Sequence, residues 1–357
     1  MRGDYIRIGI VGAGANTRTK HIPSLQEMGG VGIVSVCNRS LESSSKVARE
    51  FGIPTMYEHW QDLVTAPDTD AILIGTWPYL HCPVTLAALA ANKHVLCEAR
   101  MAMNARQAHL MFDAARRHPT RTAMLVPAPH TLRVDKTVRR LIAEGYPGNL
   151  LAIEVRAGGS FLDPGAPLHW RQDVEVSGLN TMTLGIWYES LLRWVGEAVQ
   201  VTARGKTFIT MRRDGQGVMR AVRVPEHVDV VADMACGAQA HLQISNVTGL
   251  AGPPEVWLFG SEGTLRFSED KLYGGHKTDQ ALSEIQISPE EEGRWRVEEE
   301  FINAIRGEEP VKNTTFDTGE KYMEFTDACA RSMLESRQIA LPLKLGDMAP
   351  ADGHYAL

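Results

Sequence analysis

The segment Tyr5-Ile-Arg-Ile-Gly-Ile-Val11 runs directly into Gly12-Ala-Gly14-Ala-Asn16-Thr17-Arg18. The first run is rich in β-branched residues and predicts a buried parallel strand. Gly12 suits a tight turn, and Gly14 lets the backbone approach a pyrophosphate held at the start of the next helix. A second apolar strand at residues 31–37 completes a unit of the length that dinucleotide-binding folds use.

The match to the usual glycine pattern is incomplete. Thr17 stands where a third glycine is usual, and the loop to His21 is one residue longer than usual. A Gly-x-Gly pair also occurs in ordinary tight turns, so the prediction depends on the order strand, turn, helix and strand. We expect a dinucleotide to contact the turn through the following residues: Gly12, Gly14, Asn16, Thr17 and Arg18.

The end of the second strand faces the cofactor ribose in such folds. NAD-specific sites commonly place a carboxylate there, whereas this chain has Asn38, Arg39 and Ser40. Arg39 can pair with a 2'-phosphate or stack on adenine, or it can be a solvated loop residue. We therefore predict NADP or NAD as the cofactor, with NADP preferred.

Composition limits the classes of function. The chain has 357 residues, 44% hydrophobic and 22% charged, which suits a globular protein of two domains. Its net charge of -6 predicts no general attraction to nucleic acid or to an anionic membrane. No apolar run reaches the roughly 20 residues of a membrane span, and the early first strand leaves no room for a signal peptide. We expect a cytoplasmic protein without nucleic-acid or membrane partners.

The five cysteines are scattered and include no Cys-x-x-Cys pair, which is typical of a reduced cytosolic protein. The run His94-Val-Leu-Cys97-Glu98 contains possible metal ligands. At the end of a buried strand, such side chains more often pack in the core than bind a metal ion, so we predict no metal site.

Two domains are expected. Between residues 41 and 126, predicted helices alternate with short apolar strands, which indicates a parallel sheet covered on both faces. From residue 199 to 267 the chain is a series of strand-like runs separated by turns, which indicates hairpins. We predict a Rossmann dinucleotide-binding domain at residues 1–128 and an α+β domain at 129–357, with a mainly antiparallel sheet and with helices at 131–144, 289–306 and 317–336.

The sequence resembles the glucose-fructose oxidoreductase, inositol dehydrogenase and MocA family over nearly its whole length. The resemblance rests on these motifs: Gly12-x-Gly14, Thr76-Trp-Pro78 with His81, Lys93-His-Val-Leu-Cys-Glu98, His169-Trp170-Arg171 and Glu300-Phe-Ile-Asn-Ala-Ile-Arg-Gly307. It implies an NAD(P)-dependent oxidoreductase with carbohydrate-like substrates, and a homodimer or homotetramer formed through an open sheet. It also implies cofactor contacts by these residues: Thr76, Trp77, His81, Glu98, Trp170 and Arg171.

The departures from this family fall on the chemistry. Members usually read Glu-Lys-Pro where this chain reads Glu98-Ala99-Arg100. Members also carry an Asp and a His four residues apart on a later helix, where alignment places Thr183 and Trp187. All three usual proton-handling groups are therefore replaced.

Neighbouring residues are the remaining candidates for catalysis. Glu98 is expected to position the cofactor and, as a second choice, to act as general base. Arg100 does not deprotonate, but it suits an alkoxide or an acidic substrate. His130 and His169 can titrate near neutral pH, although a loop histidine is more often a surface residue.

Tyr188 lies at the edge of the helix face that carries Trp187, and is either a proton donor or a packed aromatic residue. Glu189 should point away from that face, as a solvated or interface carboxylate. We expect a hydride transfer between nicotinamide and a CH–OH or ketone group. The alternatives are a redox-neutral lyase or glycosidase that uses bound NAD(H) transiently, and a non-catalytic NADP-binding sensor.

Overall fold

The computed structural model describes residues 5–344, 346 and 348, and it divides into two compact units. Unit 1 runs to Pro127 and resumes at Arg296–Glu320, and unit 2 comprises Ala128–Trp295 and the chain from Lys321. The first break lies one residue before the boundary we expected. The segment Arg296–Glu320, however, joins unit 1, whereas the sequence analysis placed it in the second domain. The last residues of that expected domain, 349–357, lie outside the described residues.

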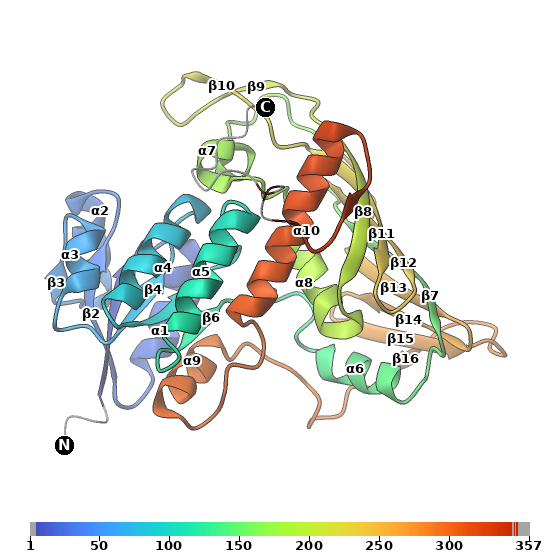
Figure 1. The fold of residues 1–357 in the computed structure, drawn as a ribbon, viewed down its shortest axis with the longest axis horizontal. Helices are drawn as coiled ribbons and strands as arrows, with labels where there is room; N and C mark the ends of the chain where they lie inside the picture. Colours follow the sequence, from blue (N-terminus) through green and yellow to red (C-terminus); the bar gives the residue numbers. More distant parts are fainter. Residues whose placement is uncertain (1–4, 345, 347, 349–357) are drawn as a thin grey trace. The chain divides into compact units, whose positions relative to one another are not determined.

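Unit 1 contains a parallel six-stranded sheet in the order β3-β2-β1-β4-β5-β6, which confirms the predicted Rossmann fold (Figure 1). The strands are β1 (Ile6–Val11), β2 (Val31–Cys37), β3 (Thr55–Met56), β4 (Ala71–Ile74), β5 (His94–Cys97) and β6 (Ala123–Leu125). β1 and β4 are fully or almost fully buried apolar strands, as a sheet covered on both faces requires. The strand order reverses between β1 and β4, and ligands of such sheets bind beyond the carboxyl ends of these strands.

The helices of unit 1 begin where capping side chains stand. Ser40 accepts a hydrogen bond from the N–H of Ser43 at the start of α2, and Asn104 accepts one from the N–H of Gln107 at the start of α5. α4 and α5 pack side by side (Figure 1). The helices are α1 (Ile22–Gln26), α2 (Leu41–Phe51), α3 (Trp60–Thr65), α4 (His81–Ala90), α5 (Ala105–Arg117) and α9 (Val297–Arg306), and α10 (Phe316–Glu335) starts in unit 1 and continues into unit 2.

A π-helical turn, Thr17–His21, follows the glycine turn. The N–H of Ile22 donates to the carbonyl of Thr17, five residues earlier. A π-turn holds one residue more than an α-turn, so this element absorbs the extra residue that the sequence shows before His21. It also rotates His21 into the interior, where the side chain is fully buried.

Unit 2 is built on a nine-stranded mixed sheet in the order β16-β15-β14-β13-β7-β12-β11-β8-β17. Only the β7–β12 pair among these neighbours is parallel, which confirms the mainly antiparallel prediction. The strands are β7 (Leu150–Ala157), β8 (Ala198–Lys206), β11 (His227–Met234), β12 (Gln239–Ser245), β13 (Glu255–Gly260), β14 (Gly263–Ser268), β15 (Lys271–His276), β16 (Ser283–Ile285) and β17 (Ile339–Ala340). A separate hairpin pairs β9 (Met211–Arg213) with β10 (Met219–Ala221).

Helices cover one face of this sheet. α6 (Asp135–Ala143) packs on α8 (Leu184–Val195), whose Tyr188 stacks on Phe325 of α10. Side chains alternate along the strands, so that in β11 Val230 and Ala232 are buried while Val231 is 42% exposed. The other face therefore remains open in a single copy of unit 2.

The helix predicted at residues 289–306 begins only at Val297. Gly293 explains the late start, because a Cβ at this position would lie 1.8 Å from the carbonyl oxygen of Leu132. The chain must pass that backbone before it can coil. The break also coincides with the passage from unit 2 to unit 1.

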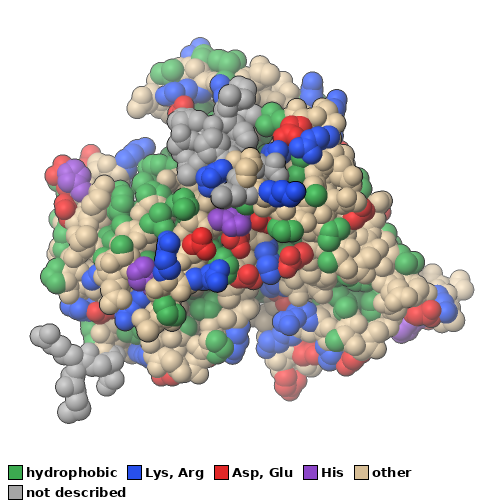
Figure 2. Space-filling view, viewed as in Figure 1, with side chains coloured by type: hydrophobic (Ala, Val, Ile, Leu, Met, Phe, Trp, Pro, Cys, Tyr) green, Lys and Arg blue, Asp and Glu red, His purple; other side chains and the backbone are tan. Residues whose placement is uncertain are grey.

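The surface carries charges of both signs. On the face shown in Figure 2, Lys and Arg side chains are interspersed with Asp and Glu. Among the helices of residues 5–344, none is both long enough and apolar enough to cross a lipid bilayer.

Gly75→Ala tests the close packing at the end of β4. A Cβ there would lie 2.2 Å from Oγ1 of Thr17 and 2.3 Å from the carbonyl oxygen of Gly12, so we expect a loss of ~1–3 kcal/mol in unfolding free energy. Denaturant titration of the full chain measures it. Gly29→Ala is the control, because its Cβ would meet no atom within 4 Å. Equal stability of the two variants would contradict this account.

Candidate dinucleotide-binding and catalytic site

The glycine turn lies at the predicted edge of the unit 1 sheet. Gly12 has φ +85°, and a Cβ there would lie 2.5 Å from Cγ2 and 2.8 Å from N of Thr76. A Cβ on Gly14 would lie 3.3 Å from the carbonyl oxygen of Gly75. Thr17 is buried beneath the turn, with Oγ1 3.4 Å from the carbonyl of Gly12. The turn thus leaves backbone open at Gly14, and Thr17 supports it from below.

Asn38 holds the turn from the end of β2. Its Oδ1 accepts a 2.7 Å hydrogen bond from the N–H of Ala13, and its Nδ2 donates to the carbonyl of Ser43. Ser40 caps α2, and Arg18 pairs with Glu50 at 2.5 Å. Among the three residues predicted for the ribose, Arg39 has an exposed side chain.

Glu98, directly after β5, is held as an ionised carboxylate. Its Oε1 accepts from Nε2 of His21 at 3.0 Å and from Nδ2 of Asn16, and its Oε2 accepts from the N–H of Ala99 at 3.1 Å. Burial by itself would raise the pKa of Glu98, but His21 and these hydrogen bonds lower it below the ordinary value. A carboxylate with a lowered pKa is a weak base, so the geometry favours the positioning role over the general base.

His81 is fully buried and joins two loops of the same sheet edge. Its Nε2 lies 2.9 Å from the carbonyl oxygen of Thr76, and its Nδ1 lies 2.8 Å from that of Arg100. Burial lowers the pKa of His81, although two facing carbonyls favour the cation. His81 therefore ties the two loops together from the interior, and its predicted contact with a cofactor stays a prediction.

Arg100 follows Ala99 through a cis peptide bond, and its side chain is only 2% exposed. This burial weighs against the predicted direct hold on a substrate alkoxide. Trp77, by contrast, is 42% exposed.

His130, near the start of unit 2, is exposed and stacks on Trp187 with ring centroids 4.9 Å apart and 13° between the planes. Partial desolvation of the stacked ring lowers the pKa of His130, Asp270 opposes that change, and Arg193 adds to it. The imidazole is therefore neutral at pH 7 and can accept a proton.

A buried ion pair anchors the backbone beside His130. Glu189 accepts from the N–H of Ala128 at 3.0 Å, and Arg193 binds Glu189 at 2.7 Å and the carbonyl of Ala128 at 3.0 Å. Glu189 is 1% exposed, so the prediction of a solvated or interface carboxylate was wrong. Arg193, one helical turn later, and the amide of Ala128 make burial of this charge possible.

Tyr188 lies in the core of unit 2. Its side chain is 2% exposed, its hydroxyl accepts a 2.8 Å hydrogen bond from the N–H of Ala198, and its ring stacks on Phe325 with centroids 3.6 Å apart. Burial raises its pKa well above the ordinary value. The packed aromatic residue, and not the proton donor, fits this geometry.

His169 caps a short 3-10 helix, Trp170–Gln172. Its Nδ1 accepts a 3.3 Å hydrogen bond from the N–H of Arg171, whose guanidinium lies 4.1 Å from the Trp170 ring centroid. Partial burial and then Arg171 lower the pKa of His169. The cap engages one ring nitrogen, so His130 is the better placed base of the two histidines.

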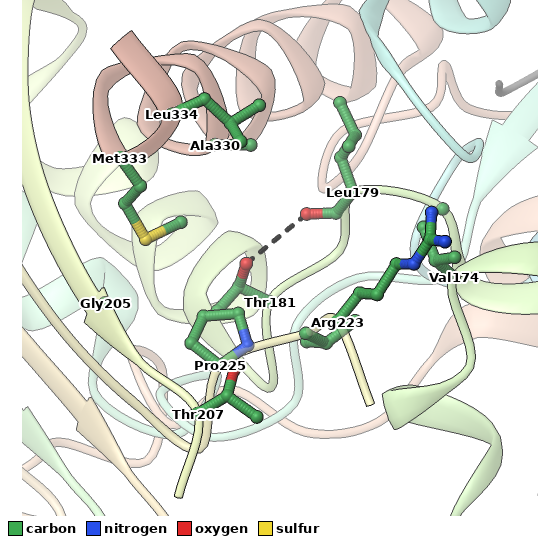
Figure 3. Close-up of a pocket in the computed structure, with 12 residues that line it drawn as sticks. Val174, Leu179, Thr181, Gly205, Thr207, Arg223, Pro225, Ala330, Met333 and Leu334 are labelled. Atoms are coloured by element: carbon green, nitrogen blue, oxygen red, sulfur yellow. Dashed lines mark hydrogen bonds between the residues drawn. The ribbon is translucent and has the colours of Figure 1, made fainter. Parts of the chain in front are cut away.

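Unit 2 also contains a pocket of about 160 Å³, which no predicted site residue lines (Figure 3). Leu179, Ala330 and Met333 supply apolar walls, and the Arg223 side chain reaches toward Val174. Across the described residues, no group of three or more His, Cys, Asp or Glu side chains has an arrangement suited to a metal ion.

Comparison with known proteins agrees with these features. The oxidoreductase family with an NAD-binding Rossmann fold matches residues 6–125, and the Gfo/Idh/MocA C-terminal domain matches residues 136–266. Levoglucosan dehydrogenase of Pseudarthrobacter phenanthrenivorans is 26% identical over 67% of this chain and 66% of its own length. 1,5-Anhydro-D-fructose reductase of Ensifer adhaerens is 36% identical over 42% of this chain and 44% of its own length. The chain thus spans about two thirds of the first relative and under half of the second.

Solved structures share the fold. Levoglucosan dehydrogenase in complex with NADH and L-sorbose superimposes with a TM-score of 0.82 at 21% identity, over 94% of this chain and 99% of that one. An oxidoreductase domain protein from Kribbella flavida gives 0.83 at 20% identity, over 95% and 100%. A Rossmann unit with a glycine turn and a mainly antiparallel second unit define a two-domain dinucleotide-binding protein. The chain belongs to the Gfo/Idh/MocA family of oxidoreductases.

Sequence reasoning missed two buried residues that lie behind Glu98. His21 appeared only as the end of a long loop, and Glu298 appeared only as part of a predicted helix. Nδ1 of His21 contacts Oε1 of Glu298 in unit 1. The only sequence signal for His21 was the extra residue before it, because a π-turn can accommodate one additional residue.

Tyr188→Phe tests the structural assignment of Tyr188. Loss of the hydroxyl leaves the buried N–H of Ala198 without its acceptor, so we expect a loss of ~1–3 kcal/mol in unfolding free energy. Any turnover measured for the wild type should persist in the folded variant. Tyr79→Phe, at a 38% exposed position, is the control. A large loss of kcat without loss of stability would restore Tyr188 as proton donor.

Proposed function

We propose that this protein is an NAD(P)-dependent oxidoreductase that acts on a CH–OH or ketone group of a sugar, polyol or glycoside-like substrate. The observation that carries the proposal is the glycine turn at the switch point between β1 and β4, where Gly12 has φ +85° and packs so closely on Thr76 that no side chain fits. When bound, a nicotinamide dinucleotide supplies hydride chemistry. The Gfo/Idh/MocA family assignment supports this function.

We assign separate roles to the residues of the two units. Glu98, ionised and held by three donors, positions the cofactor in unit 1. His130 accepts the substrate hydroxyl proton, because it combines an exposed ring with a lowered pKa. Trp170 and Arg171 form a stacked pair in the short 3-10 helix before α7 (Val174–Ser177) and contribute to ligand contact.

The substrate class rests on two supports. Two relatives are named for carbohydrate substrates: levoglucosan dehydrogenase and 1,5-anhydro-D-fructose reductase. The exposed ring of Trp77 suits the apolar face of a sugar ring. We therefore place cyclic sugars and their anhydro derivatives first among the substrates to be screened.

We also propose assembly through the open face of the unit 2 sheet. On this face Val231 is 42% exposed, and the half-buried rings of Trp257 and Phe259 stack with their centroids 5.5 Å apart. Apolar side chains on an open sheet face suit a homodimer or homotetramer. A reducing, cytoplasmic location fits the five cysteines, which are all free.

The preference for NADP is tested by Arg39→Ala. Asn38 is engaged with the turn, so Arg39 is the group available for a 2'-phosphate. We expect the affinity for NADPH to fall by ~10-fold to 150-fold, the value of a charge-assisted hydrogen bond, while NADH binding changes little. Fluorescence titration with both nucleotides measures this. Arg49→Ala is the control, because Arg49 is also an exposed arginine but lies near the far end of α2. The predicted preference for NADP is rejected if the wild type binds NADH more tightly and Arg39→Ala has no effect on either affinity.

His130→Phe tests the assignment of His130 as the group that accepts the substrate proton. The variant keeps the ring stacked on Trp187 but cannot accept a proton, so kcat for alcohol oxidation should fall by ~10²-fold to 10⁴-fold with nucleotide affinity unchanged. Nicotinamide absorbance during turnover of the sugar panel is the readout. His276→Phe is the control, because His276 also lies against an aromatic ring, with its centroid 4.2 Å from that of Tyr146 and 39° between the planes.

The pH profile follows from the same residue. The base must be neutral, so wild-type oxidation should decline as pH falls through the lowered pKa of His130. That limb should be absent from the residual activity of His130→Phe. No redox change of either nucleotide with any of the sugars would reject the proposed function.

A further inference from the structure

A buried cluster of three titratable groups lies inside unit 1. His21 is fully buried on the π-helical turn, Glu98 follows β5, and Glu298 lies in the first turn of α9 and is 3% exposed. Nε2 of His21 faces Oε1 of Glu98 at 3.0 Å, and Nδ1 of His21 faces Oε1 of Glu298. Each ring nitrogen therefore points at a carboxylate oxygen.

This geometry requires one proton in each of the two gaps between ring and carboxylate. A neutral imidazole has a single N–H and would turn a lone pair toward one carboxylate, which is repulsive at this distance. Two protons are available either on an imidazolium between two carboxylates or on a neutral ring beside one protonated acid. The short contacts on both sides of His21 fit the two-proton arrangement.

The surroundings favour the imidazolium. Burial opposes the charged ring, but the hydrogen bonds and charges of Glu298 and Glu98 prevail and raise the pKa of His21 to about 9. The pKa of Glu98 moves in the opposite direction. On the same turn, Arg18 is paired with Glu50 and Lys20 is exposed.

We infer that His21 is a positioning residue, which as an imidazolium ion holds Glu98 in the orientation needed for the cofactor. The inference rests on the proposed function and extends it, because it makes cofactor affinity depend on a proton buried in unit 1. Glu298 contacts His21 on the side opposite Glu98, and its charge keeps that proton in place. Asn16 supplies a further donor to Glu98.

The sign of the pH effect follows from the charged state. Below the ordinary histidine pKa of about 6.5 the full stabilisation by His21 is present, and it is lost as pH rises through about 9. Loss of the proton leaves Glu98 facing a lone pair of the ring. The carboxylate then rotates away, and affinity for the nucleotide falls on the alkaline side.

The protonation state is tested by nitrogen NMR of the full-length protein labelled with ¹⁵N-histidine. At about pH 8, above the ordinary histidine pKa, we expect the His21 ring to carry a proton on both nitrogens. Its signals should be absent from His21→Gln and present in His59→Gln, a control at an exposed histidine of unit 1. A neutral His21 ring at pH 7 overturns the inference.

The functional part is tested by titrating NADPH and NADH into wild type, Glu298→Gln and His59→Gln across the alkaline range. Wild type and His59→Gln should lose affinity with a midpoint near pH 9. Glu298→Gln keeps the size of the side chain but removes one charge, so its midpoint should shift at least one unit lower, while affinity at pH 6 stays within about threefold. A merely structural Glu298 would instead weaken binding equally at every pH, which overturns the inference.

The two proposals fail in different ways. A wild type that binds neither nucleotide overturns the proposed function and the cofactor role of His21 with it. A wild type that binds a nucleotide with an alkaline midpoint unmoved by Glu298→Gln overturns only the role of His21.

Discussion

The backbone of the glycine turn and the backbone at the end of β4 are in direct contact, and the cofactor edge of unit 1 depends on that contact. The N–H of Gly75 donates to the carbonyl of Val11, and neither Gly12 nor Gly75 has room for a side chain. Thr17 fills the space beneath. Because the turn is fixed in this way, Asn38 can reach Ala13 from one side and Asn16 can reach Glu98 from the other.

Buried charges then set the finer geometry in both units. In unit 1 an imidazole lies between two carboxylates, and in unit 2 Arg193 lies between Glu189 and Asp135. Each arrangement leaves its charges paired, which is the condition for burying them. The cluster in unit 1 holds the Glu98 carboxylate through His21. The ion pairs in unit 2 fix the backbone at Ala128, two residues before His130.

The sequence predicted the fold well and the roles of single residues less well. Strand and helix patterns located α2, β5 and the cap at Asn104, since these signals are local in the chain. It missed β15, whose glycines weaken the strand pattern, and it began α9 too early because the obstacle at Gly293 is a distant carbonyl. Among the site residues, Tyr188, His81 and Glu189 proved to be interior residues. Periodicity gives the face of a helix but not what packs against that face.

By itself, the sequence determined that a Rossmann unit with a Gly-x-Gly turn is followed by a second unit with a mainly antiparallel sheet. Those features depend on residue types close together in the chain, on strand periodicity and on glycine conformation. The tertiary structure alone decided that Glu298 meets His21, 277 residues earlier, and that Glu189 pairs internally rather than with solvent. A pKa depends on which charges lie within a few ångströms and on how far water is excluded, and only the folded chain defines both.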